Sequence, residues 1–190
     1  MAIIIGIDPS ISSTGICVWD TERNINKYFN IVKNPTKKLR SLESDHIKVL
    51  GYFVDRKLKD LSNQEKEMAK TMDILHIMPK IKWILELYKP SKVIMEGIAM
   101  SAGGRIDQLA GLNYSIRQAV FQVKGCELLV LTPQTIKKSF VGDGGANKDM
   151  MASAWKACDP NSIDYEPFPK NAEDLADAYA MAHYQDGNKL

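Results

Sequence analysis

The sequence has few cysteines, no long apolar run and no strong excess of charge. Its 190 residues include only three cysteines, Cys17, Cys126 and Cys158, which are far apart and form no CxxC pair. This scarcity argues against a disulfide framework and against a zinc site, so we expect free, buried thiols. No apolar run approaches the roughly 20 residues that a membrane-spanning helix needs, and the N-terminus lacks the features of a signal peptide. We therefore expect a cytoplasmic protein with no membrane association.

The overall composition is that of an ordinary soluble protein. Hydrophobic residues make up 45% of the chain and charged residues 25%, and the formal net charge is only +2. A chain of this length can bury one well-formed core but is too short for two full-sized domains. We find no internal repeat, and we expect a single domain over residues 1–190.

The hydrophobic pattern predicts an α/β fold built on a five-stranded mixed sheet. Short apolar or alternating segments at Ala2–Ile7, Thr14–Trp19 and Ile25–Val32 predict a three-stranded antiparallel meander. Two more strands are expected at Lys92–Glu96 and Glu127–Leu131. Because helical patterns alternate with these later strands, the crossovers predict that they are parallel.

Five further segments carry a helical pattern and are expected to flank the sheet. They are Asn63–Leu87, Ile106–Val123, a helix beginning at Thr132-Pro133, Ala146–Ala157, and a last helix from about Asn171 to Tyr184. Pro79 predicts a kink or a break in the first of these helices. The stretch from Lys37 to Ser62 has no clear pattern, so an insertion at about residues 34–70 remains open to interpretation as a helical segment or a lid.

Carboxylates stand at three places where apolar surroundings are expected. Asp8 and Glu96 each end a short buried strand, and Asp174 and Asp177 lie three residues apart on one face of the last helix. An unpaired buried carboxylate costs several kcal/mol, so each of these sites needs a partner. A turn aspartate at the end of the first strand and an exposed acidic helix are the plainer alternatives, and Glu173 is an alternative to Asp174.

If the four carboxylates meet, they form a set of hard oxygen ligands without histidine or thiolate. Such a set suits Mg²⁺ or Mn²⁺. Two such ions about 3.5 to 4 Å apart can activate water and stabilise the leaving oxygen of a phosphodiester. With these four charges set aside, the rest of the chain carries +6 rather than +2, which suits binding to DNA phosphates.

Four motifs in order along the chain are similar to those of a known family. They are GIDPSISSTGICV at Gly6–Val18, VIMEG at Val93–Gly97, TIKKSFVGDGGANK at Thr135–Lys148 and EDLADAYAMAH at Glu173–His183. Together they resemble the RuvC family of Holliday-junction resolvases, within the ribonuclease H-like superfamily. The resemblance implies a ribonuclease H-like fold and a homodimer.

The resemblance also implies roles for individual residues. The metal-binding catalytic carboxylates would be Asp8, Glu96, Asp174 and Asp177, with two Mg²⁺ ions per site and Mn²⁺ as a substitute. Lys137 and Lys148 match lysines near the scissile phosphate, and Lys148 is expected to be catalytic. Basic residues expected to contact DNA are Lys137, Lys138, Lys148 and Arg105. Without the family match, each lysine would be interpreted as a solvated helix residue.

Two features depart from the family pattern. After Glu96 the family commonly carries an aromatic residue that stacks on a base, whereas this chain has Ile98-Ala99-Met100. The segment from Glu22 to about Lys70 is also longer than the usual connection. These departures put base-dependent recognition in question and leave the role of the longer segment open.

The leading hypothesis is a homodimeric, Mg²⁺-dependent endonuclease that nicks symmetrically related strands of four-way DNA junctions. A two-fold junction needs two active sites, and the helix at Ile106–Val123 is a candidate dimer interface. A close alternative is a less selective nuclease of branched DNA such as forks and flaps, as found among phage members. More distant alternatives are an actin-like or sugar-kinase-like ATPase, which the length disfavours, and a non-catalytic DNA-binding module. The expected setting is a bacterial cell, with a phage origin open, and the sequence does not indicate whether a helicase is a partner.

Overall fold

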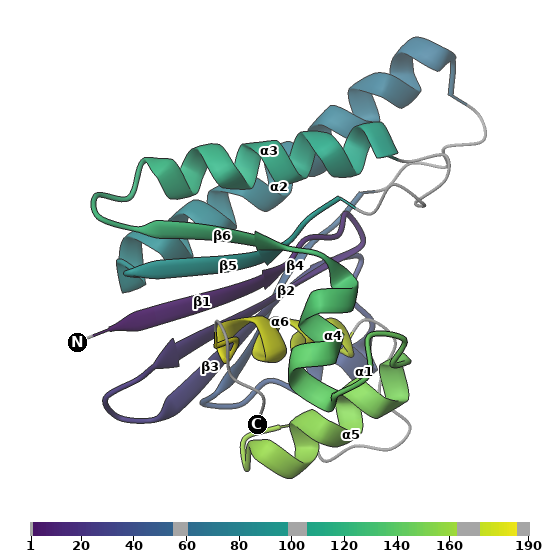
Figure 1. Ribbon diagram of the computed structural model, residues 1–190. Coiled ribbons are helices and arrows are strands. Elements are labelled where there is room, and N and C mark those ends of the chain that lie inside the picture. Colours follow the sequence, from purple (N-terminus) through teal and green to yellow (C-terminus); the bar gives the residue numbers. More distant parts are fainter. Residues whose placement is uncertain (1, 55–60, 99–105, 163–171, 186–190) are drawn as a thin grey trace.

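The protein folds around a six-stranded mixed sheet with helices on both faces (Figure 1). This computed structural model describes residues 2–54, 61–98, 106–162 and 172–185. The strands are β1 (Ile3–Asp8), β2 (Ser13–Asp20), β3 (Ile25–Lys33), β4 (Ile47–Tyr52), β5 (Lys92–Glu96) and β6 (Glu127–Leu131). Their order across the sheet is β4-β3-β2-β1-β5-β6.

Two helical layers cover the sheet. The helices are α1 (Lys37–Arg40), α2 (Asn63–Tyr88), α3 (Ile106–Phe121), α4 (Pro133–Val141), α5 (Lys148–Cys158) and α6 (Asp174–Ala182). The long helices α2 and α3 lie side by side on one face, and α4, α5 and α6 gather on the other (Figure 1). Each layer has its own core, because alternate side chains of a strand point to opposite faces. Ile3, Ile5 and Ile7 of β1 belong to the first core, whereas Ile94 of β5 belongs to the second.

The five predicted strands and their directions are confirmed. β1, β2 and β3 form the antiparallel meander, and β5 and β6 continue the sheet parallel to β1. The sixth strand, β4, was not predicted. It comes from the segment expected to be an insertion, and it pairs in parallel with β3 at the edge of the sheet.

Two predictions about helices need correction. α2 runs from Asn63 to Tyr88 with Pro79 inside it, so of the predicted kink or break the break is wrong. The residues around the proline are held by burial, since Ile77, Met78 and Ile81 all pack in the core of that face. The last helix begins at Asp174 and ends at Ala182, inside the predicted limits, and Asn171 lies outside the described residues.

The expectations from composition hold in part. All three cysteines are free, but only Cys17 is buried; Cys126 is partly exposed and Cys158 is exposed, so the prediction of buried thiols is wrong for these two. None of the helices in the described part of the chain is long and apolar enough to cross a membrane.

Helix α6 lies directly against the backbone of β1 and β2. A Cβ atom added to Gly6 would stand 2.0 Å from the Ala178 carbonyl oxygen, and one added to Gly15 would stand 2.2 Å from the Asp174 carbonyl oxygen. Both distances are far below any normal contact, so only glycine allows this approach. The close approach places the first turn of α6, which carries Asp174 and Asp177, over the ends of the central strands.

Candidate active site

Asp8 and Glu96 lie at the same edge of the sheet, the one formed by the C-terminal ends of the inner strands β1 and β5. Each is the last residue of its strand, and β1 and β5 are parallel neighbours in which Ile7 pairs with Met95. Because parallel strands end at the same edge, the two carboxylates follow at matching positions.

Asp174 and Asp177 approach this edge from the first turn of α6. Together with Asp8 and Glu96 they line one pocket of about 230 Å³. Lys137 of α4 and Lys148 of α5 complete its polar wall, and Pro133, Ile136 and Met151 supply the apolar remainder. The structure thus brings together the four predicted carboxylates and two of the predicted lysines from five separate elements.

Burial and mutual repulsion raise the pKa values of the carboxyl groups on the strands. The pKa of Asp8 lies well above its ordinary value, first because the group is desolvated and then because of the charges of Asp174, Asp177 and Glu96. Burial, with the charge of Asp177, raises the pKa of Glu96 to about 7. These groups therefore resist ionisation as long as no cation compensates them.

The helix carboxylates show the same imbalance with partial relief. Burial and the charge of Asp174 raise the pKa of Asp177 to about 6, although Lys148 and Lys137 act against the shift. Burial also raises the pKa of Asp174, and a hydrogen bond from Ser13 and the charge of Lys148 oppose it.

Lys148 forms an ion pair with one of the helix carboxylates, Asp174. Its Nζ atom stands 2.8 Å from Oε1 of Glu173 and 3.5 Å from Oδ1 of Asp174. Burial alone would lower the pKa of Lys148, but the hydrogen bond to Glu173 and the charge of Asp174 hold it above its ordinary value. Lys148 is therefore charged at neutral pH and already engaged at the mouth of the pocket.

The donor set fits a hard divalent cation. The polar groups of the pocket are four carboxylates and two lysines, with no histidine or cysteine among the lining residues. In the part of the chain that the structure describes, no group of three or more His, Cys, Asp or Glu side chains is arranged to hold a metal ion as it stands. Lys148 pairs with Asp174 at 3.5 Å, and a cation bound to that carboxylate would take the place of this ion pair.

The remaining predicted DNA contacts lie apart from the pocket or outside the described residues. Lys138 is exposed on α4 and does not line the pocket. Arg105 lies outside the described residues, as do Ala99 and Met100 of the segment after Glu96.

Two supporting residues were not recognised from the sequence. Ser13 is fully buried at the start of β2, where its Oγ lies 2.9 Å from Oδ1 of Asn30 and also interacts with Asp174; its single hydroxyl proton can be donated to only one of the two acceptors at a time. Asn113 of α3 is also buried and donates from Nδ2 to the backbone carbonyl of Glu96 at 2.9 Å. A signal for Asn113 existed, because it is a polar residue next to Leu112 on the apolar face of a predicted amphipathic helix.

Known proteins of similar structure share this fold. No protein-family model matches the sequence, and no curated protein matches it significantly. Among solved structures, RuvC from Thermus thermophilus superposes with a TM-score of 0.58 at 20% identity, covering 95% of this chain and 90% of that one. The same organism's RuvC in complex with a Holliday junction substrate gives 0.56 at 18% identity, covering 96% and 90%. The yeast mitochondrial Holliday junction resolvase Ydc2 gives 0.50 at 16% identity, covering 95% and 77%. The chain therefore has the RuvC-like fold that its motifs predict.

Proposed function

We propose that this protein is a metal-dependent endonuclease that cuts four-way DNA junctions. The observation that carries the proposal is the pocket at the sheet edge, where four carboxylates and two lysines from five elements meet. The RuvC-like fold supports it, since one of the similar structures is a RuvC bound to a Holliday junction substrate.

The residues that would hold Mg²⁺, or Mn²⁺ in its place, are Asp8, Glu96, Asp174 and Asp177. A pair of such ions supplies an activated water and stabilises the leaving oxygen during attack on a phosphodiester. With a pKa of about 7, Glu96 is partly protonated at neutral pH, so loading the pocket releases a proton and becomes more favourable as the pH rises.

The two lysines of the pocket would bind the DNA phosphate. In the metal-free protein Lys148 forms ion pairs with Glu173 and Asp174. Once another cation binds Asp174, the Lys148 ammonium group can instead form an ion pair with a DNA phosphate. Lys137 lines the same pocket, and its charge lowers the pKa values of Glu96 and Asp177. Charge-assisted contacts of this kind position the backbone without reading the sequence.

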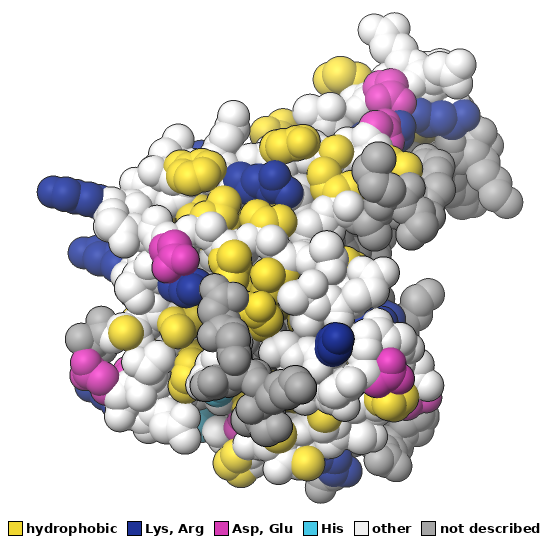
Figure 2. Space-filling view, in the orientation of Figure 1, with side chains coloured by type: hydrophobic (Ala, Val, Ile, Leu, Met, Phe, Trp, Pro, Cys, Tyr) yellow, Lys and Arg dark blue, Asp and Glu magenta, His cyan; other side chains and the backbone are white. Residues whose placement is uncertain are grey.

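Paired nicking of a two-fold junction requires two copies of the pocket, so we propose a homodimer. The outer surface of α3 and β6 supports this part of the proposal. Tyr114 and Phe121 of α3 are 57% and 74% exposed, and Val130 of β6 is 36% exposed. Hydrophobic side chains gather on this face in Figure 2, broken by basic ones.

A nuclease with broader selectivity for forks and flaps is the second candidate. The observation in its favour is Ile98, which follows Glu96 and Gly97 where an aromatic residue would be expected to stack on a base. The two candidates share the same pocket and chemistry and differ only in substrate range.

The test is cleavage of end-labelled substrates by the purified protein. A four-way junction, a fork, a flap and a linear duplex are each incubated with Mg²⁺ or with a chelator. We expect paired cuts in the junction that require Mg²⁺. In Glu96→Gln the cleavage rate should fall by about 100-fold or more. Glu86→Gln, an exposed position on α2, is the matched control and should cut like the wild type.

The other outcomes assign the alternatives. Equal cutting of fork, flap and junction supports the broader nuclease, and equal cutting of linear duplex contradicts any selectivity for branched DNA. ATP hydrolysis without DNA cleavage would indicate an ATPase, and junction binding without cleavage would indicate a binding module.

A further inference from the structure

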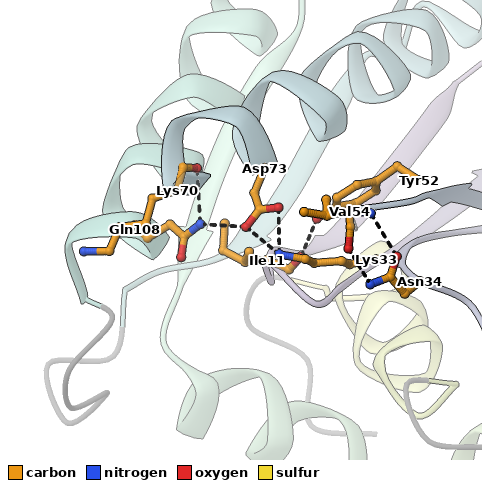
Figure 3. A network of polar contacts seen from close by, with 8 residues as sticks. All are labelled: Ile11, Lys33, Asn34, Tyr52, Val54, Lys70, Asp73 and Gln108. Atoms are coloured by element: carbon orange, nitrogen blue, oxygen red, sulfur yellow. Dashed lines mark hydrogen bonds and ion pairs between the residues drawn. The ribbon is translucent and has the colours of Figure 1, made fainter. Parts of the chain in front are cut away.

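The unpredicted strand β4 makes a direct hydrogen bond to the connection that follows Asp8. Tyr52, the last residue of β4, donates its hydroxyl to the backbone carbonyl of Ile11 at 2.8 Å (Figure 3). Ile11 lies in the connection between β1 and β2, at residues 9–12. β4 stands at the edge of the sheet beyond β3, so this side chain reaches back to the connection between the two central strands.

The ring of Tyr52 is fixed by its surroundings. It is only 5% exposed and stacks on His76 of α2, with ring centroids 5.3 Å apart and planes 19° from parallel. The Nζ atom of Lys80 lies 5.6 Å from the ring centroid. Burial and the nearby charge of Asp73 raise the pKa of the hydroxyl, so it stays protonated and remains a donor.

A second set of contacts holds the same connection from β3. The backbone N–H of Lys33 donates to the Ser12 carbonyl at 3.1 Å, and the Lys33 ammonium pairs with the buried Asp73 of α2 at 2.9 Å. Asp73 also accepts a hydrogen bond from Gln108 of α3 at 3.2 Å (Figure 3). The connection is thus tied to both long helices as well as to β3 and β4.

This connection joins Asp8, which lines the pocket, to Ser13, which supports another pocket residue. Asp8 precedes it, and Ser13, which hydrogen-bonds Asp174, follows it. The hydroxyl of Thr14, near the start of β2, donates to the Ser10 carbonyl at 2.6 Å, so the connection is also braced against β2. A displacement of Ile11 therefore reaches a strand carboxylate on one side and a helix carboxylate on the other.

We infer that Tyr52 is a positioning residue through which the added strand β4 fixes the β1–β2 connection and, with it, Asp8. The catalytic consequence rests on the proposed nuclease function, whereas the structural tie does not. β4 is then a functional support of the pocket, and its segment need not touch DNA to affect cleavage.

The test variant is Tyr52→Phe, which removes only the hydroxyl and keeps the stacking on His76. The matched control is Tyr88→Phe at the C-terminal end of α2, beside Phe29 and just before the N-terminal end of β5. Amide hydrogen exchange is measured by mass spectrometry on peptides that cover residues 8–14. We expect exchange there to be about fivefold to tenfold faster in Tyr52→Phe and unchanged in Tyr88→Phe.

A second variant loosens the same strand from another point. Asn34 exchanges two side-chain hydrogen bonds with Val54, at 3.0 and 3.3 Å, just beyond Tyr52 (Figure 3). Asn34→Gly removes them while keeping a residue that tolerates the positive φ of 50°. We expect a smaller acceleration of exchange in the same peptides.

Cleavage then separates positioning from simple support of the fold. The single-turnover rate on a four-way junction should fall about tenfold in Tyr52→Phe, with junction affinity in chelator unchanged within about twofold. Unchanged hydrogen exchange in residues 8–14 would overturn the inference, as would a cleavage rate equal to that of Tyr88→Phe. If the wild type cuts no branched substrate, the proposed function fails, and hydrogen exchange alone decides whether Tyr52 holds the connection.

Discussion

Replacing Gly15 with alanine tests whether the approach of α6 to β2 sets the geometry of the pocket. The new Cβ would lie 2.2 Å from the carbonyl oxygen of Asp174 and 2.6 Å from its carbonyl carbon. Both atoms belong to the backbone, so no change of rotamer can relieve the clash. Ordinary contact begins at 3.4 Å, and the separation must therefore increase by at least 1.2 Å.

This displacement acts on the residue that carries one of the carboxylates. Overpacking of this kind costs about 1 to 3 kcal/mol of the free energy of unfolding. A misplacement of about 1 Å in a reacting constellation costs on the order of 100-fold in rate. We expect Gly15→Ala to remain folded at 20 °C and to lose about 100-fold of its single-turnover cleavage rate, while affinity for the junction in chelator changes little.

The control is Gly111→Ala in α3. Its Cβ would meet only Cδ1 of Ile74 at 3.2 Å, which is the end of a flexible side chain, and alanine favours a helix interior by up to about 1 kcal/mol. Urea unfolding gives the free energy of unfolding of both variants. The reasoning is refuted if Gly15→Ala has the same free energy of unfolding and the same cleavage rate as the wild type, because α6 would then tolerate the added methyl group without moving the carboxylate.

Three further predictions follow from charged groups. Asp177→Asn should raise the free energy of unfolding of the metal-free protein at pH 8 by about 1 to 2 kcal/mol, because a pKa of about 6 means that the folded state disfavours the charged carboxylate. This gain, measured by urea unfolding, should vanish below about pH 4, where the carboxyl group is protonated in both the folded and the unfolded state. Burial lowers the pKa of His183 to about 4, so the unfolded state takes up a proton first as the pH falls from about 6.5, and His183→Gln should remove an acid-induced loss of at most about 3 kcal/mol. Lys33→Met should lower the free energy of unfolding by about 3 kcal/mol, because it leaves the buried Asp73 without its cation, and adding Asp73→Leu should restore most of this stability. The prediction is contradicted if urea unfolding shows that the effects of the two substitutions simply add.

The carboxylates could be predicted from the sequence because each gives a local signal. Asp8 and Glu96 interrupt short apolar runs, and Asp174 and Asp177 share a helix face by spacing alone. Strands β1, β2 and β5 were predictable for a similar reason, since burial on both faces makes strands short and apolar, whereas β3 and β6 were predictable from their short apolar or alternating patterns.

β4 could not be predicted in the same way. Its sequence, Ile47 to Tyr52, includes Lys48 and Gly51 and forms an edge strand, so pairing with β3 defines it more than its own pattern does. The support of the pocket by Tyr52 and Ser13 is equally invisible in the sequence. Each bond joins residues brought together only by the completed sheet.

The charges in the pocket indicate that its lysines do not fully neutralise its carboxylates. When ionised, the four carboxylates carry a charge of −4 and the two lysines a charge of +2. Lys148 also forms an ion pair with Glu173, so its charge is divided between Glu173 and the pocket. Even with both lysines in place, the pKa values of Asp8, Glu96 and Asp177 remain raised, so the lysines do not compensate the buried charge. A purely structural site would be more stable with one carboxylate fewer, as the Asp177→Asn prediction states. The excess of negative charge is costly in the metal-free protein and favourable with divalent cations, which is the property expected of a site that binds them for catalysis.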